Sequence, residues 1–219
     1  IVPSTGKSIT YRPYVVREEK ILLIAMESQD NIAIENAVLD IIGLCVESPI
    51  DANKLATFDV EFIFANLRAK SVGEGIDIEP ECSAKDCEST QQIKINIDKV
   101  TVENLGTAKD RIIKINDNIS IELKNLAMKD RLDSDKDMTD TDVIIQTIAK
   151  SIETIYSGED IFNGSESSFE EMIEFVESLN SSQFTAIVEK ISNPPYLSYK
   201  FEYDCKECGT KNEKELKGL

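Results

Sequence analysis

The sequence predicts an α+β fold in which N-terminal helices, a central antiparallel β region, C-terminal helices and a terminal β-hairpin follow one another. Three observations lead to this prediction. Apolar residues recur at helical spacing in the first third of the chain, alternate with polar residues from Ile76 onward, and return to helical spacing beyond residue 142. Helices and strands in separate blocks are typical of α+β proteins, whereas a parallel sheet needs strands that alternate with helices.

Residues 1–17 read as an extended arm, because they show neither the helical nor the strand period. Tyr11, Arg12 and Tyr14 form an aromatic and basic cluster near the end of this arm. Such a cluster more often anchors an arm onto its own domain or onto a partner than it catalyses a reaction. We therefore expect contacts, not a core of its own, to order the arm.

An N-terminal helical region is predicted over residues 18–75, with helices at about 17–28, 30–46 and 57–73. Glu18 lies in the first turn of the first helix, where a negative charge is favourable. Asp30 and Thr57 are suitable N-caps for the second and third helices, and Gly73 is a suitable stop. Cys45 lies among apolar residues of the second helix and is most simply a small buried side chain.

The central β region is predicted over residues 76–130. Its clearest strand carries Ile93, Ile95 and Ile97 in alternation with polar residues, which is the pattern of a half-buried strand. Similar short segments are expected at residues 76–78, 113–115 and 119–123.

A second helical region is predicted over residues 131–195, before a terminal hairpin at 196–219. The acidic stretch from Asp130 to Asp142 reads as a loop. It is followed by one amphipathic helix that carries Val143, Ile144, Ile148, Ile152 and Ile155 on its apolar face. A loop between Gly158 and Gly164 and two short helices at 169–179 and 181–191 complete the region.

Four cysteines give the strongest chemical signal in the chain. Cys82 and Cys87 stand in the central β region, and Cys205 and Cys208 stand in the terminal hairpin. Two close pairs of thiolates, each in a turn between strands, suit one tetrahedral structural Zn²⁺ site. Gly209 supports the second turn, since such turns usually need a residue that tolerates positive φ. The pattern predicts a zinc ribbon whose two halves are separated by a long insertion.

Two other interpretations of the cysteines stay open at this point. The four residues could form disulfides, or they could be ordinary thiols. The first residues show no signal-peptide pattern, so the sequence gives no support for an oxidising compartment. Four residues separate Cys82 from Cys87, where two are more usual in a zinc knuckle.

Composition argues against several classes of function. The formal net charge of −17 repels nucleic-acid backbones, and no basic patch is visible, so we expect no nucleic-acid partner. No apolar run is long enough to cross a bilayer, so we expect no membrane insertion. The chain has no histidine, which excludes a Ser-His-Asp triad, a Cys-His pair and a histidine-ligated catalytic metal. We expect a protein that is not an enzyme and has no catalytic residues.

Two partial motifs do not qualify as sites. Gly6-Lys7-Ser8 resembles the end of a phosphate-binding loop, but the position five residues earlier is Ile1 instead of glycine. Asp133, Asp135 and Asp137 have the opening spacing of a calcium-binding EF-hand loop. The sixth and twelfth positions of that loop are Met138 and Ile144, where glycine and glutamate are needed.

An ordered series of segments through nearly the whole chain carries a family resemblance. The segments are Pro3-Ser4-Thr5-Gly6-Lys7, Tyr11-Arg12-Pro13-Tyr14, Glu18-Glu19-Lys20 with Leu22 and Leu23, Arg68-Ala69-Lys70-Ser71-Val72-Gly73-Glu74, Ile95-Asn96-Ile97-Asp98, Ile119-Ser120-Ile121-Glu122-Leu123, Ile155-Tyr156, Glu174-Phe175, Leu179 with Gln183-Phe184, Cys205-Lys206-Glu207-Cys208-Gly209 and Leu216-Lys217-Gly218-Leu219. This series resembles the baseplate hub protein family of T-even-type contractile-tailed bacteriophages.

The resemblance implies a structural or assembly component of the baseplate hub, in the virion tail, that is assembled in the host cytoplasm. Its partners would be other phage baseplate, hub and tail proteins. A different interpretation rests on the cysteines and the acidity alone. An acidic zinc-ribbon module directed at a host protein would show the same two features.

Overall fold

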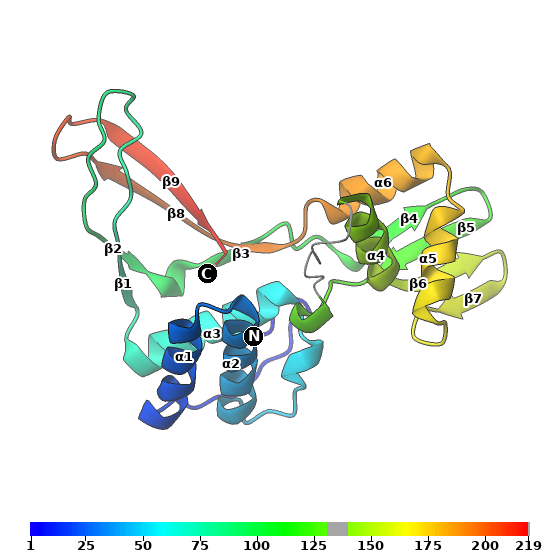
Figure 1. Cartoon of the computed structure of the whole chain (residues 1–219), viewed down its shortest axis with the longest axis horizontal. Coiled ribbons are helices and arrows are strands. Elements are labelled where there is room, and N and C mark those ends of the chain that lie inside the picture. The colour runs from blue at the N-terminus through cyan, green and yellow to red at the C-terminus, as the bar shows by residue number, and fades with distance from the viewer. Residues whose placement is uncertain (131–139, 219) are drawn as a thin grey trace. The chain divides into compact units, whose positions relative to one another are not determined.

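The computed structural model describes residues 1–130 and 140–218 and confirms the α+β prediction. The chain divides into two compact units, whose elements are labelled in Figure 1. Unit 1 comprises Ile1–Ala52, Phe58–Glu103 and Tyr196–Leu219, and unit 2 comprises Asn53–Thr57 and Asn104–Pro195. Apart from the short piece Asn53–Thr57, unit 2 is therefore an insertion between the central part and the C-terminal part of unit 1.

Three helices lie near the N-terminus, as predicted: α1 (Val16–Ser28), α2 (Asn31–Cys45) and α3 (Thr57–Val72). The Asp30 carboxylate caps α2 by accepting a hydrogen bond from the Ile32 N–H at 2.9 Å. Cys45 is fully buried, as expected for a small apolar side chain. Other buried apolar residues on α2 and α3 are Ile41, Ile42, Val60, Ile63 and Leu67.

The residues before α1 are held by hydrogen bonds to the helices of unit 1. The backbone N–H of Ser4 donates to the Asp59 carboxylate at 2.8 Å, and that of Tyr14 donates to the Ser71 hydroxyl at 2.9 Å. The backbone N–H of Arg12 donates to the Cys45 carbonyl at 3.0 Å. Val2 is also buried. Within the aromatic and basic cluster, Tyr14 is buried and the Arg12 guanidinium donates to the Leu44 carbonyl at 3.2 Å, so these side chains also anchor the arm onto its own unit.

Two β-hairpins and one added strand complete unit 1. β1 (Gly75–Ile78) pairs with β2 (Ile93–Asn96), and β8 (Tyr196–Asp204) pairs with β9 (Lys211–Lys217). β3 (Thr101–Glu103), which the sequence did not reveal, pairs with the start of β8, so that Glu103 lies opposite Tyr196. Since Glu103 and Tyr196 flank the insertion, this pairing brings the two ends of the inserted segment together.

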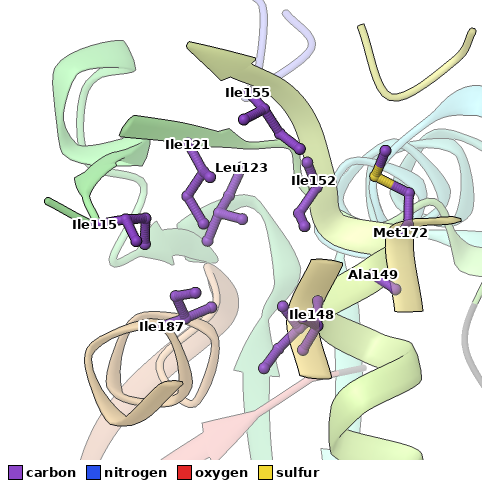
Figure 2. Packing of buried hydrophobic residues seen from close by; sticks show 10 residues of the cluster. Ile115, Ile121, Leu123, Ile148, Ala149, Ile152, Ile155, Met172 and Ile187 are labelled. Atoms are coloured by element: carbon purple, nitrogen blue, oxygen red, sulfur yellow. The ribbon is translucent and has the colours of Figure 1, made fainter. Parts of the chain in front are cut away.

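Unit 2 contains an antiparallel sheet with strand order β4 (Ile112–Lys114), β5 (Ile119–Leu123), β6 (Ile152–Ser157) and β7 (Asp160–Asn163). Its helices are α4 (Asp140–Ser151), α5 (Phe169–Glu177) and α6 (Ser181–Ile191). Figure 2 shows the buried side chains gathered between the strands and the helices: Ile115, Ile121, Leu123, Ile148, Ala149, Ile152, Ile155, Met172 and Ile187. Short 3-10 helices occur in both units, at Ala52–Lys54, Ile97–Lys99, Ala108–Arg111 and Met128–Asp130.

The predicted helix from Val143 to Ile155 is wrong in its second half. α4 ends at Ser151, and Ile152 and Ile155 belong to strand β6. Leu123 pairs with Ile152 and Glu122 pairs with Thr154, so Glu153 is an extra residue that forms a β-bulge. The bulge shifts the strand's alternation by one residue, and Ile152 and Ile155 both become buried. Their separation of three residues therefore imitates a helical period.

The predicted loop between Gly158 and Gly164 is also wrong, because it contains strand β7. Gly158 lies in the turn of the β6–β7 hairpin, in which Ser157 pairs with Asp160. Most of the predicted acidic loop, with Asp133, Asp135 and Asp137, lies outside the described residues. At its ends, Asp130 closes a 3-10 helix and Asp140 begins α4.

Among the helices of the described residues, none combines the length and the apolar character that crossing a membrane needs.

Candidate metal centre

The first cysteine loop, residues 79–92, connects β1 to β2. A bridge between Glu81 and Thr90 continues the hairpin beyond its strands. At the end of the loop the backbone N–H of Cys82 donates to the Ser89 carbonyl at 3.0 Å, and that of Cys87 donates to the Ala84 carbonyl at 3.1 Å. These bonds fold the loop so that both cysteines lie close to the C-terminal hairpin.

The second cysteine loop, residues 205–210, connects β8 to β9. The Cys205 N–H donates to the Thr210 carbonyl and the Gly209 N–H donates to the Cys205 carbonyl, both at 2.9 Å. Gly209 has φ of +72°, a left-handed conformation that glycine adopts without steric cost. The predicted role of this glycine in the turn is therefore confirmed. Figure 1 shows the two loops side by side at the ends of their hairpins.

The structure brings all four predicted cysteines together. The four Sγ atoms of Cys82, Cys87, Cys205 and Cys208 lie within 4.8 Å of one another. Cys82 Sγ lies 3.7 Å from Cys208 Sγ, and Cys87 Sγ lies 3.8 Å from Cys205 Sγ. A tetrahedral site with Zn–S bonds of about 2.3 Å has S···S edges of about 3.8 Å. We call these four residues the cysteine cluster.

These distances also bear on the disulfide interpretation. A disulfide bond joins sulfurs about 2.05 Å apart. All five cysteines of the chain are free thiols in the structure. The two shortest printed sulfur contacts, Cys82 with Cys208 and Cys87 with Cys205, each join one loop to the other. The arrangement can hold a metal ion between the loops.

Hydroxyl and N–H groups surround the sulfurs of the cluster. The Ser89 hydroxyl lies 3.0 Å from Cys87 Sγ and 3.1 Å from Cys205 Sγ. The Thr210 hydroxyl lies 3.2 Å from Cys208 Sγ, and the Ala84 N–H donates to Cys82 Sγ at 3.5 Å. Donors of this kind stabilise thiolates, which are the form that binds a metal.

The same contacts shift the pKa values of the thiols. The Ser89 hydroxyl, with help from the backbone N–H of Cys208, lowers the pKa of Cys205 to about 6. The Thr210 hydroxyl and N–H lower the pKa of Cys208. The pKa of Cys82 is instead raised to about 11, because burial and hydrogen bonds with the other thiols outweigh the lowering effect of the Ala84 N–H. Without a metal the cluster therefore holds thiols and thiolates together, and a bound cation would displace the remaining protons.

Three side chains that the sequence reasoning missed join the two loops. The Asn212 carboxamide, which is 1% exposed, accepts a hydrogen bond from the Ser83 N–H at 2.7 Å and donates to the Thr210 carbonyl at 2.9 Å. Gln91 accepts from the Lys206 N–H at 3.0 Å and donates to the Asp204 carbonyl at 3.2 Å. The Tyr203 hydroxyl donates to the Glu81 carbonyl at 2.7 Å.

Asn212 had a weak signal in the sequence. It is an uncharged polar residue at the start of a strand whose other residues, apart from Leu216, are lysines and glutamates. Ser89 and Thr210 each follow a cluster cysteine by two residues, which is also visible in the sequence. Gln91 and Tyr203 gave no such signal, because their role depends on the meeting of two distant hairpins.

A comparison with protein families gives the context for this centre. The model of the family described as T4 bacteriophage base plate protein matches residues 1–219, the full length of the sequence. The chain belongs to this family. Membership in the T4 bacteriophage base plate protein family places the chain in the tail baseplate of the phage virion and indicates other phage tail proteins as its partners. No curated protein and no solved structure matched the chain.

The family membership confirms the resemblance to a T4-like baseplate protein and the expected location in the virion tail. A family of baseplate proteins also favours a structural role over an enzymatic one. In a structural protein, a metal ion bound by the cysteine cluster would act on the stability of the fold.

Proposed function

We propose that this chain is a structural or assembly component of the baseplate hub, that it acts through protein–protein contacts, and that one structural Zn²⁺ ion is held by Cys82, Cys87, Cys205 and Cys208. The observation that carries the proposal is the convergence of these four sulfurs, within 4.8 Å, in a chain that matches the baseplate family over its full length. The family match supports a role in the baseplate, and the cysteine cluster supports a metal ion that joins the two cysteine loops.

Zinc is the metal that the donor set favours. Four thiolates at tetrahedral distances are typical of structural zinc or iron sites, and hard cations such as Mg²⁺ prefer oxygen ligands. A site with four protein ligands leaves no position for a substrate, so it acts on folding and not on catalysis. The ribbon-like pair of hairpins is the usual support for such a site.

The metal would support the pairing of β3 with β8, which holds the two ends of the inserted segment together. Unit 2 is inserted between β3 and β8, and only three residue pairs, from Thr101–Ser198 to Glu103–Tyr196, join these two strands. A metal between the cysteine loops would hold the far end of the β8–β9 hairpin and keep β8 in register with β3. A metal-stabilised hairpin would resist local unfolding, which is useful in a protein whose two units both contact neighbouring proteins.

Surface features support a function through protein contacts. The chain carries a formal net charge of −17. Large apolar side chains are nevertheless exposed on α1, namely Val16, Leu23, Ile24 and Met26. Exposed apolar side chains on one helix are typical of surfaces that a partner covers.

A phage that lacks the gene for this chain tests the hub proposal. We expect it to make tails without complete baseplate hubs, and we expect the intact chain supplied from a plasmid to restore them. Mass spectrometry of purified baseplates would measure the hub proteins. Complete hubs in the absence of the chain would overturn the proposal. If the chain instead co-purified stoichiometrically with one protein from uninfected host extract, the host-directed alternative would replace it.

Elemental analysis of the purified chain tests the metal separately. We expect about one zinc per chain, in line with a single four-cysteine site. Substitution with Co²⁺ should give the visible absorption of a tetrahedral cobalt–thiolate centre. A chain that holds no metal and shows no such absorption would remove the zinc from the proposal and leave the hub role to the phage experiment.

A further inference from the structure

Strand β7 has an exposed edge whose character differs from that of the edge strands β4 and β9. All four of its residues, Asp160–Asn163, are exposed, and it lies at the end of the strand order in unit 2. Its two central side chains are large and apolar: Ile161 is 63% exposed and Phe162 is 51% exposed. Two such residues in an unprotected edge strand are unusual, because edges invite pairing with other chains.

Two other edges carry the protection that natural sheets use. On the opposite edge of the same sheet, β4 contains Lys114. The edge strand β9 of unit 1 contains Lys211, Lys214 and Lys217. Lysines on an edge oppose the addition of another strand. β7 contains neither lysine nor proline.

The register of β7 shows which backbone groups face outward. The Gly164 N–H donates to the Glu153 carbonyl at 2.8 Å, next to the pairing of Asn163 with Thr154. Residues in an antiparallel pair alternate between those that bond to the partner strand and those that do not. Ile161 therefore directs its N–H and C=O groups away from β6, toward the open edge, and Asn163 does the same with its N–H. The Asn163 carbonyl accepts a hydrogen bond from the Glu166 N–H at 3.0 Å.

The two apolar side chains lie on opposite faces of the sheet. Phe162 lies opposite Ile155, which is buried in the core of unit 2, and Ile161 lies opposite Tyr156. Directly opposed residues share a face. An added strand would therefore find backbone partners between two apolar side chains, with Phe162 extending the apolar face of the core.

Charge indicates the chemistry of the added strand. Between Lys150 and Lys190 the sequence contains no lysine or arginine. The acidic residues of this segment are Glu153, Glu159, Asp160, Glu166, Glu170, Glu171, Glu174, Glu177 and Glu189. Such a segment attracts a basic partner and repels a second copy of itself.

We propose that β7 is a docking edge for an extended, basic segment of another baseplate protein, which adds to the sheet of unit 2 as a further antiparallel or parallel strand. Backbone hydrogen bonds would give affinity, and alternate apolar and basic side chains of the partner would give specificity. The inference rests on the proposed function, since it names the chemistry of one partner in the baseplate.

A short synthetic peptide of alternating lysine and valine is a direct probe of this edge. We expect it to bind the full-length chain and to shift the amide NMR signals of β7 and of its neighbour β6. A matched peptide with N-methyl groups on alternate residues cannot donate to the edge, and we expect its binding to be weaker by at least about tenfold. Equal binding of the two peptides, or shifts spread over the acidic surface, would overturn the inference.

Substitutions at the two edges of the sheet provide the matched variants. Ile161→Lys should weaken peptide binding by about tenfold, since it adds the protection that β7 lacks. Ile112→Lys, on the exposed edge strand β4, should leave binding unchanged within about twofold. Circular dichroism verifies the fold, and Ile161→Thr replaces Ile161→Lys if the lysine variant does not fold. If the wild-type chain formed a dimer and Ile161→Lys were monomeric, β7 would pair with a second copy of the chain, and the proposal would be overturned. Because these measurements use the purified chain, their failure leaves the hub proposal to the phage experiment.

Discussion

The side chain of Asn212 binds the backbone of Ser83, which lies 129 residues earlier in the chain. The Ser83 N–H donates to Asn212 Oδ1 at 2.7 Å, and Asn212 Nδ2 donates to the Thr210 carbonyl at 2.9 Å. One buried carboxamide thus connects the first cysteine loop to the second. This connection would hold the four sulfurs near each other before a metal arrives, so that less chain entropy is lost on binding.

Replacing Asn212 tests this role. Asn212→Leu leaves the Ser83 N–H without its side-chain partner and removes one of the two hydrogen bonds that the Thr210 carbonyl accepts, the other coming from the Cys205 N–H. Each lost hydrogen bond should cost about 0.5–1.5 kcal/mol. We expect zinc affinity to fall by about 10–100-fold, as for other residues that support metal ligands. Competition with a chelator of known affinity measures the change. Glu213→Gln, at the exposed neighbouring position, is the control, and unchanged zinc affinity in Asn212→Leu would exclude the role.

Removal of one ligand has a larger expected effect. Cys205→Ser should release the metal and loosen the β8–β9 hairpin, because structural zinc contributes directly to folding free energy. Elemental analysis measures the loss, and hydrogen exchange of the β8 and β9 amides measures the loosening. Cys45→Ala is a suitable control, since Cys45 is buried outside the cluster. If Cys205→Ser kept its metal and its melting temperature, the cluster would not be a metal site.

The cysteine cluster could be predicted from the sequence because its signal is local. Each pair of cysteines lies within a single loop between two strands, and the residue types define the chemistry. The support from Gln91 and Tyr203 could not be predicted in the same way. Both side chains bond to backbone groups of the other hairpin, more than a hundred residues away in the chain.

The fold shows the same division between local and distant causes. Asp30 and Thr57 mark helix starts because caps and first turns depend on neighbouring residues. Strand β6 was missed because the bulge at Glu153 depends on the pairing of β6 with β5. β3 was missed for a similar reason. It has three residues, and its partner β8 follows the whole of unit 2.

Glu18 gives the chain a sensitivity to acid. The Glu18 carboxylate accepts a hydrogen bond from the Val15 N–H at 2.8 Å and pairs with Arg12 and Arg17, and these contacts lower its pKa to about 2 from the ordinary 4.5. Because the folded pKa is below the unfolded one, the stabilisation is complete above about pH 4.5 and is lost as the pH falls toward 2.

Glu18→Gln should therefore lower the free energy of unfolding at pH 7. The difference from the wild-type chain should shrink as the pH falls from 4.5 to 2, because the wild-type carboxylate then becomes protonated as well. Urea unfolding at a series of pH values measures this. Glu19→Gln, which changes the neighbouring carboxylate of the same helix turn, is the control. A destabilisation of Glu18→Gln that stayed constant down to pH 2 would show that the charge is not its cause.

A core substitution in unit 2 tests whether the two units are separately stable. Ile148 on α4 is fully buried in the cluster of unit 2 that Figure 2 shows. Ile148→Ala should destabilise this unit by about 2–5 kcal/mol, because it removes buried apolar atoms and leaves a cavity. Ile161→Ala, at an exposed position of the same unit, should cost less than about 0.5 kcal/mol.

In the same experiment, zinc binding measures whether unit 1 stays folded. All four cysteines belong to unit 1, in the parts of the chain that flank the insertion. If the units are independent, Ile148→Ala should lower the urea concentration at which amides of unit 2 exchange freely, and the zinc should stay bound until unit 1 unfolds at its unchanged midpoint. Zinc release that moved together with the unfolding of unit 2 would mean that the two units form one cooperative structure. In that case β3 and β8, which flank the insertion, would transmit the core defect to the cysteine cluster.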